Sequence, residues 1–393
     1  MGEQADTVLY TMGNTEKERS KRIMKKVLRI TGKILGITAA ALAVLTMILM
    51  LVRFIGQKML DRTPKGGINE SGYADINGTK MWINIYGQDK DNPVMLYLHG
   101  GPGFATSGFD YPILRKLSAD YTVVNWDQRG AGKSQINYPY EGELTSDLLR
   151  EDLLETVEYI LDRTGKEKLT ILGSSWGTLY GGDFALEHPE LVECFIGTSQ
   201  VVDYQDIYTG LKTHALEWTK DCEEDRQRVL NYDPEDFSDE NMKLCHDLRK
   251  KYCVSDNFFK DSDFDVIAAM FFDPYYSLSE TFKLVKSLSS GSLGEQYDAF
   301  MYTEKNGRKV LNENGLQDFS LKGRTDYKMP VFIRTGRYDF QTDPYQAKAY
   351  FDEMTAPYKE FRYVDGGHFL PLIDSEGLAE FVKNAKKKMY GSN

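Results

Sequence analysis

A serine between two glycines is the residue of this sequence best placed to do chemistry. Ser175 lies in the stretch Gly173-Ser174-Ser175-Trp176-Gly177, between an apolar segment predicted as a strand and a segment predicted as a helix. A G-x-S-x-G pattern at a strand-to-helix turn holds the serine on a sharp backbone elbow, with its hydroxyl projecting from the edge of the sheet. The pattern therefore predicts that Ser175 is a nucleophile for acyl transfer.

A serine hydroxyl needs a neighbouring base, and that base is usually a histidine held by a carboxylate. Of the five histidines, only His368 follows both a predicted strand and a pair of glycines, Gly366 and Gly367. The other four lie in a glycine-rich turn, behind the helix that follows the serine, or in a long insertion: His99, His188, His214 and His246. We predict that His368 is the base.

The carboxylate is expected at the end of the strand that precedes His368. Asp339 ends the stretch Thr335-Gly336-Arg337-Tyr338-Asp339, 29 residues before the histidine. Asp343 lies four residues further along the same loop and is the alternative acid. Either side chain could instead cap a helix that starts near Pro344. We predict that Asp339 orients His368.

Acyl transfer passes through a tetrahedral oxyanion, which backbone N–H groups stabilise when no secondary structure uses them. A second glycine-rich turn, His99-Gly100-Gly101-Pro102-Gly103, follows another apolar segment. The amide of Trp176, directly after the serine, and the amide of Gly101 or its neighbour are predicted as the two donors. His99 is expected to hold the turn in place and to take no part in catalysis.

Strands that alternate with helices must position these residues. The dipeptide Asn77-Gly78 predicts a tight hairpin turn, and an amphipathic helix is predicted from Leu149 onward. Further strands are predicted at residues 94–98, 121–126, 169–172, 329–333 and 361–364. This alternation predicts an α/β fold, with a mostly parallel sheet covered by helices on both faces.

A long insertion interrupts the predicted core. Residues 66–200 and 326–393 are expected to form the two parts of the core, and residues 201–325 are expected to form a cap made of helices. The predicted cap helices include residues 211–229, 241–252 and 263–272. We use the name cap for residues 201–325 throughout.

The chain resembles the proline iminopeptidase group of α/β-hydrolases, which are serine aminopeptidases with a helical cap. The resemblance covers residues 72–200 well and residues 325–375 more loosely. It implies the α/β-hydrolase fold, and the order Ser175, Asp339, His368 is the order of the triad in such enzymes. Three motifs carry it: His99-Gly100-Gly101-Pro102-Gly103, Asp127-Gln128-Arg129-Gly130-Ala131-Gly132-Lys133-Ser134, and Gly173-Ser174-Ser175-Trp176-Gly177-Thr178.

Two departures from the group concern the substrate. Pro344 stands five residues after Asp339, where members of the group often have proline after four, and Phe340 stands where some members have an acidic residue that holds the substrate amine. Acidic cap residues, among them Asp203, Glu217, Glu223 and Glu224, could replace that contact or could simply be solvated.

The N-terminal part predicts a membrane anchor. Residues 34–52 are nineteen uncharged, mostly apolar positions. As a helix they span roughly 28 Å, which matches the hydrocarbon thickness of a bilayer. We expect a transmembrane helix at residues 34–55, preceded by a basic cytoplasmic tail at residues 1–33. A cleaved signal peptide and a buried core helix are the alternatives.

Charge predicts the orientation of this span. Eight Lys and Arg lie between Lys17 and Lys33, against four between Arg53 and Lys65. The positive-inside rule then leaves the N-terminus in the cytoplasm and the large domain outside the cell, as a single-pass protein of the cell membrane.

The composition excludes some functions. Residues 1–65 hold twelve basic and five acidic side chains and so carry a net charge of +7. Because the net charge of the whole chain is −11, the remaining residues carry −18. Binding to nucleic acid is therefore not expected. The four cysteines have no zinc-site spacing, and Cys222, Cys245 and Cys253 could either include a disulfide or stay reduced. No metal or cofactor is predicted.

These patterns predict a membrane-anchored serine hydrolase. Its expected substrates are small peptides with an N-terminal residue such as proline, as the resemblance implies. The alternative is an esterase or amidase for small or lipid-like acyl groups, which aromatic cap residues could enclose: Phe271, Phe272, Tyr275 and Tyr276. A binding protein that keeps the scaffold without catalysis is the second alternative.

Overall fold

The computed structural model describes residues 2–253, 256–289 and 295–391. By its internal contacts the chain divides into two units, which meet between Met59 and Leu60. The described residues of the first unit lie within one helix, α1 (Gly2–Leu60), which extends beyond the predicted span at both ends. Its part from Arg19 to Leu60 is long and apolar enough to cross a membrane, a test that a signal sequence also passes. The apolar window of this helix is not buried, whereas the core helix of a soluble protein is mostly buried.

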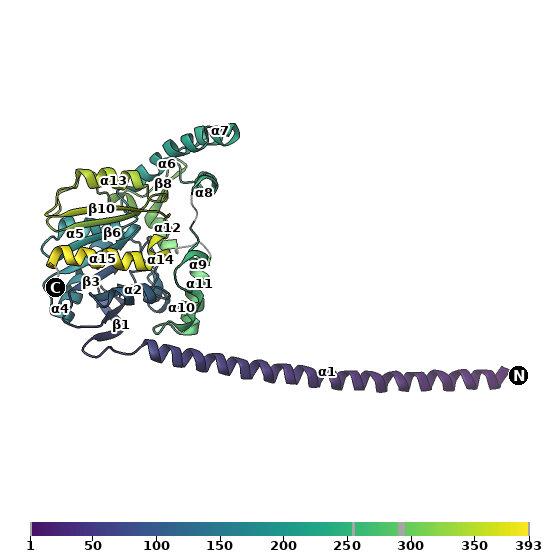
Figure 1. Cartoon of the computed structure of the whole chain (residues 1–393). Coiled ribbons are helices and arrows are strands. Elements are labelled where there is room, and N and C mark those ends of the chain that lie inside the picture. The colour runs from purple at the N-terminus through teal and green to yellow at the C-terminus, as the bar shows by residue number, and fades with distance from the viewer. Residues whose placement is uncertain (1, 254–255, 290–294, 392–393) are drawn as a thin grey trace. The chain divides into compact units, whose positions relative to one another are not determined.

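The second unit contains an eight-stranded sheet (Figure 1) with the order β1-β2-β4-β3-β5-β6-β9-β10. The strands β3 to β10 of this sheet run parallel, and the first hairpin joins them antiparallel through β2 and β4. The predicted mostly parallel sheet is therefore confirmed. The bounds are β1 Ile68–Ile76, β2 Thr79–Gly87, β3 Val94–Leu98, β4 Thr122–Trp126, β5 Leu169–Ser174, β6 Val192–Thr198, β9 Val331–Gly336 and β10 Lys359–Val364.

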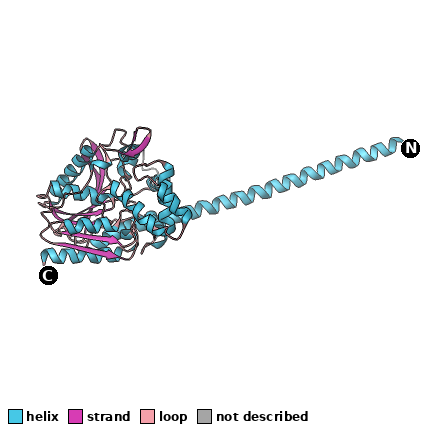
Figure 2. Cartoon of the chain, turned by 90° about the horizontal axis from the view of Figure 1, so that it is seen from above, coloured by secondary structure: helices cyan, strands magenta, loops and turns pink. Residues whose placement is uncertain are grey.

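Helices cover both faces of the sheet because its central strands are apolar on both sides. In β3, Leu96 and Leu98 belong to one buried cluster, whereas Met95 and Tyr97 belong to another. The first cluster includes side chains of α4 (Ser146–Thr164), α5 (Trp176–Glu187) and α13 (Pro344–Glu353), and the second those of α2 (Tyr111–Leu117) and α15 (Ser375–Tyr390). Figure 2 shows these strands in magenta and the flanking helices in cyan. Because side chains point alternately to the two faces along each strand, helices pack on both faces, and the core has three layers of helices, sheet and helices.

Two short helices complete the core. They are α3 (Gly132–Asn137) and α14 (Leu370–Ile373), and α14 follows the loop that carries His368.

The cap contains helices and also a hairpin, which was not predicted. The predicted helix at 211–229 is two helices, α6 and α7, because the chain turns between Trp218 and Glu223. The hairpin of β7 and β8 turns at Asn306-Gly307, both with positive φ, and this dipeptide is typical of such a turn. The bounds are α6 Tyr204–Trp218, α7 Glu223–Asn231, α8 Asp239–Tyr252, α9 Phe258–Asp261, α10 Val266–Phe272, α11 Leu278–Ser289, α12 Glu295–Met301, β7 Tyr302–Lys305, β8 Arg308–Leu311 and the 3-10 helix Leu316–Asp318.

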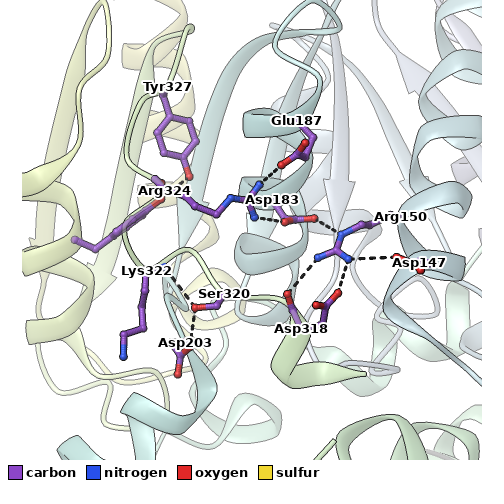
Figure 3. Close-up of polar contacts among 11 residues, drawn as sticks. Asp147, Arg150, Asp183, Glu187, Asp203, Asp318, Ser320, Lys322, Arg324 and Tyr327 are labelled. Carbon is purple, nitrogen blue, oxygen red and sulfur yellow. Dashed lines mark hydrogen bonds and ion pairs between the residues drawn. The ribbon is translucent and has the colours of Figure 1, made fainter. Parts of the chain in front are cut away.

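Ion pairs fasten the returning end of the cap to the core (Figure 3). Arg150 of α4 contacts Asp183 of α5 at 2.9 Å and Asp318 at 2.5 Å. Arg324 pairs with the other oxygen of Asp183 and with Glu187. Asp183 is therefore shared between two arginines, one from the core and one from the segment that returns to β9.

Candidate active site

Ser175 stands on a strained elbow between β5 and α5. Its φ is 52° and its ψ is −121°, a backbone conformation that residues other than glycine rarely adopt. The elbow needs glycine on both sides: a Cβ on Gly173 would lie 2.4 Å from the carbonyl oxygen of Gly177, and a Cβ on Gly177 would lie 2.1 Å from that of Leu98. The two glycines of the motif thus let the chain turn tightly against β3.

The loops after β9 and β10 bring Asp339 and His368 together. These two strands are parallel neighbours, and so their carboxyl ends lie side by side. The Nδ1 atom of His368 lies 3.1 Å from each carboxylate oxygen of Asp339. Burial opposes ionisation of Asp339, but the charge of His368 and hydrogen bonds from His368 and Thr342 outweigh it and hold the pKa of Asp339 below its usual value. With Nδ1 engaged, Nε2 is the nitrogen left for proton transfer.

The loop itself holds the Asp339 carboxylate. The backbone amides of Gln341 and Thr342 donate to one oxygen at 3.1 and 3.2 Å, and the Thr342 hydroxyl donates to the other at 2.9 Å. The alternative acid, Asp343, instead caps α13 and lies 3.1 Å from Nε2 of His214. Among the described residues, His368 therefore pairs with Asp339 and not with Asp343.

Ser175 and His368 line the same cavity, whose volume is about 270 Å³. Its lining is mainly apolar and comes largely from the core: Tyr97, Gly100, Gly101, Phe104, Thr106, Ser174, Gln341, Phe369, Pro371 and Leu372. We call it the serine cavity. The cap aromatics expected to enclose an acyl chain do not line it, because Tyr276 is buried against Ser107 and Asp127, and Tyr275 packs against Trp82.

The predicted oxyanion turn approaches the serine closely. A Cβ on Gly100 would lie 3.3 Å from Cβ of Ser175 and 3.8 Å from its Oγ. Gly101 has a φ of 123°, which favours glycine, and its carbonyl accepts a hydrogen bond from the hydroxyl of Tyr204 in α6 at 3.2 Å. Trp176 is the first residue of α5, so that its amide belongs to the helix end whose N–H groups have no partner within the helix.

The side chains of Trp176 and His99 hold the serine elbow and the oxyanion turn in place. The indole of Trp176 donates to Oε1 of Gln128 at 3.1 Å, which ties the serine elbow to the turn after β4. His99 is buried, with Nδ1 lying 2.8 Å from the carbonyl oxygen of Gly100, and burial lowers the pKa of His99 to about 4. A neutral ring of this kind fits the expected structural role.

His368 also lines a second cavity, of about 260 Å³, which the sequence did not predict. It shares His368, Phe369 and Gln341 with the serine cavity but is not lined by Ser175 or the oxyanion turn. Its remaining lining residues come from α8, from the segment after it and from the Asp339 loop: His246, Arg249, Lys250, Cys253, Asp256, Tyr338 and Phe340. We call it the basic cavity. The only sequence signal was the run Arg249-Lys250-Lys251 in the last turn of α8.

The acidic cap residues that were weighed as amine ligands do not line either cavity. Asp203 caps α6 and accepts from Ser320 at 2.7 Å, and Glu217 pairs with Lys220 on the surface. Glu223 and Glu224 lie in the first turn of α7. The carboxylate that does line the basic cavity is Asp256, which was not among the predicted site residues.

The four cysteines are free thiols, so the disulfide alternative is not supported. Cys245 is buried on α8, and burial raises the pKa of its thiol.

Residues 93–240 match a family model described as the alpha/beta hydrolase fold. The protein has the α/β-hydrolase fold. Solved structures agree: a proline iminopeptidase-related protein from Thermus thermophilus has 19% identity and a TM-score of 0.52, covering 82% of this chain and 98% of that one. A proline iminopeptidase from Mycobacterium smegmatis has 16% identity and a TM-score of 0.53, with 81% and 98% covered.

Curated relatives of this α/β-hydrolase carry peptidase names. A probable aminopeptidase of Bacillus subtilis is 34% identical over 142 residues, and a putative proline iminopeptidase of Mycoplasma pneumoniae is 32% identical over 150 residues. Each alignment covers 36% of this chain and 45% of the relative, so the match spans less than half of the length of these relatives. The predicted resemblance to the proline iminopeptidase group is confirmed, and it supports a hydrolase.

Proposed function

We propose that this α/β-hydrolase is a serine hydrolase in which Ser175, His368 and Asp339 act together in acyl transfer. The observation that carries the proposal is the position of the three residues at the ends of β5, β10 and β9. A strained serine shares a cavity with a histidine whose other ring nitrogen contacts a buried carboxylate. This arrangement suits a base that is held in one tautomer and stabilised when it becomes charged.

In the proposed reaction, Oγ of Ser175 forms a bond to the substrate carbonyl carbon and passes its proton to Nε2 of His368. The carbonyl oxygen becomes an oxyanion, which the amides of Gly101 and Trp176 would stabilise. The bond to the leaving group then breaks as His368 returns the proton to it. Water attacks the acyl-serine ester in the same way, releasing the acid and restoring Ser175.

The proposed substrates are small peptides with an N-terminal residue such as proline, cleaved in an aminopeptidase reaction. The names of the relatives support this substrate class, and the serine cavity, with a volume of about 270 Å³, has room for a small apolar side chain or ring. An esterase or amidase reaction on small or lipid-like acyl groups is the second candidate. It is favoured by the apolar lining and by Phe340, which stands where an amine-binding carboxylate would be expected.

Labelling with a fluorophosphonate probe tests the proposal, because the probe reacts with activated serines. We expect the wild-type chain to be labelled and Ser175→Ala to remain unlabelled. Ser174→Ala is the matched control and should still be labelled. A wild-type chain that takes no label, or a Ser175→Ala variant that labels equally, would contradict the proposal and favour a binding protein without catalysis.

A substrate comparison separates the two candidate reactions. Prolyl-naphthylamide and other aminoacyl-naphthylamides are compared with short-chain nitrophenyl esters on the full-length chain in detergent. A preference for the prolyl amide supports the aminopeptidase. Faster turnover of esters without any preference for proline would support the esterase.

The proposed location is the cell membrane, through a single span at residues 34–55. The length and apolar composition of α1 support a span, and the excess of basic residues before it supports a cytoplasmic N-terminus with the hydrolase outside.

A further inference from the structure

Arg249 is an arginine without an ionic partner beside the proposed base. The side chain is partly buried, and its Nε atom is buried without a hydrogen-bond partner. Among the described residues, none forms an ion pair with this guanidinium. The guanidinium carbon lies 5.8 Å from the centroid of the Tyr208 ring. By contrast, Arg150 and Arg324 each contact carboxylates (Figure 3). Leaving a buried polar group unpaired is costly, which points to a partner absent from the chain itself.

The neighbours of Arg249 do not supply that partner. Lys250 and His246 also line the basic cavity and come from the same helix. The one carboxylate in the lining, Asp256, accepts a hydrogen bond from the backbone amide of Gly367 at 2.8 Å, which ties it to the loop of His368. The cavity therefore presents two cations from the last turn of α8 against one carboxylate that is already engaged.

The lining of the basic cavity indicates which part of the substrate it would hold. It includes His368 but lacks Ser175 and the oxyanion turn, which line the serine cavity. In acyl transfer the acyl group stays on the serine, whereas the leaving group takes its proton from the histidine. A leaving group that departs past His368 therefore enters the basic cavity, whose volume of about 260 Å³ accommodates a small leaving group.

We propose that Arg249, with Lys250, binds the terminal carboxylate of the leaving amino acid, so that the enzyme favours short peptides with a free C-terminus. This inference rests on the proposed serine hydrolase function. A guanidinium suits a carboxylate because its planar donors bond both oxygens. The acyl part occupies the serine cavity, and the carbon–nitrogen bond breaks between the two cavities as His368 protonates the leaving nitrogen.

The test compares prolyl-alanine with its C-terminal amide on the full-length chain in detergent. We expect kcat/KM to be about tenfold or more higher for the free acid, the size of one charge-assisted contact. Arg249→Met should bring the two rates close together through KM, and Arg249→Lys should restore part of the preference. Lys243→Met is the matched control, because Lys243 is a basic residue of the same helix that pairs with Asp247 and does not line this cavity.

A binding measurement makes this test independent of turnover. Calorimetry with the Ser175→Ala chain should show tighter binding of the acid than of the amide, and adding Arg249→Met should remove the difference. Equal affinity for acid and amide in Ser175→Ala overturns the inference. So does a preference for prolyl-glutamate amide over prolyl-glutamine amide without any acid–amide difference, which would assign the charge to a side chain.

Turnover of the neutral substrate prolyl-naphthylamide separates the two proposals. If the wild type cleaves it but does not distinguish acid from amide, the carboxylate site is wrong and the hydrolase stands. If it cleaves none of these substrates, the aminopeptidase proposal fails, and the binding measurement alone decides the carboxylate site.

Discussion

At the scale of single residues, two aspartates four positions apart have different roles. Asp339 contacts His368, and Asp343 caps α13 and contacts His214. Both are buried, so that their types and burial do not distinguish them. What separates them is the turn between them, whose backbone amides point to Asp339 and direct its carboxylate toward the end of β10.

This difference predicts unequal effects of the same substitution. Asp339→Asn removes the charge that stabilises the histidine cation and should lower kcat at least about 100-fold, without a large change in structure. Asp343→Asn should keep activity close to the wild type, because asparagine caps a helix as well as aspartate does. Initial rates with the best substrate of the wild type check both variants. Loss of activity in Asp343→Asn with retention in Asp339→Asn would reverse the assignment.

At the scale of elements, three buried carboxyls meet where α2, β4 and the cap pack together. Burial raises the pKa of Asp110 and Asp273 to about 7 and that of Asp127 to about 6, and the pKa of Asp110 is also raised by the charge of Asp127. Asp110 accepts hydrogen bonds from Thr106 at 2.7 Å and from Asn125 at 2.9 Å. These bonds lower the pKa but do not compensate for burial.

These carboxyls predict a loss of stability as the pH rises. Their folded pKa lies above the unfolded value, so the folded chain binds more protons from about pH 4 to 7 and loses this contribution as the pH rises through the folded pKa. The wild type should therefore lose stability between pH 5 and pH 8, and Asp110→Asn should lose less. We expect the two losses in the free energy of unfolding to differ by on the order of 1 kcal/mol or more. Urea unfolding at both pH values measures this effect. The exposed Asp75→Asn is the control, and an unchanged pH slope in Asp110→Asn would contradict the prediction.

Another element-scale prediction concerns the ion pairs that hold the returning end of the cap. Asp183→Ala leaves Arg150 and Arg324 without their shared buried carboxylate and should lower the free energy of unfolding by about 3 kcal/mol. Glu187→Ala removes a mostly exposed partner of Arg324 and should cost less than about 1 kcal/mol. Thermal unfolding of both variants checks the difference, and equal losses would show that burial of Asp183 is not the cause.

At the scale of the whole molecule, α1 and the hydrolase unit are separate units of the chain. The basic residues before the apolar stretch predict a cytoplasmic N-terminus and a hydrolase unit outside the cell. Protease added to intact cells should digest the hydrolase unit and spare a tag at the N-terminus. Digestion of the tag after permeabilisation is the control. Protection of the hydrolase unit would refute the outward orientation, and loss of the tag from the mature chain would indicate a cleaved signal.

The sequence by itself determined the fold and the order of the chemical groups. Strand-end motifs around Ser175, Gly101 and His368 are local, and parallel strands bring their carboxyl ends to one edge whatever the loops contain. A local signal was also overlooked at Asn306-Gly307, where the turn chemistry that predicted the first hairpin predicts the cap hairpin equally well.

Only the tertiary structure decided which groups meet across long distances in the chain. The choice of Asp339 over Asp343 as the partner of His368 depends on the turn after β9. Burial of Tyr276 away from Ser175 and the unpaired Nε of Arg249 depend on how the cap packs on the core. Tyr276 contacts Ser107 and Asp127, which lie more than a hundred residues away in the chain, and no periodicity or turn signal specifies such a contact. The sequence therefore predicted acyl transfer at Ser175, and the packing of the cap beside His368 led to the proposal for the leaving group.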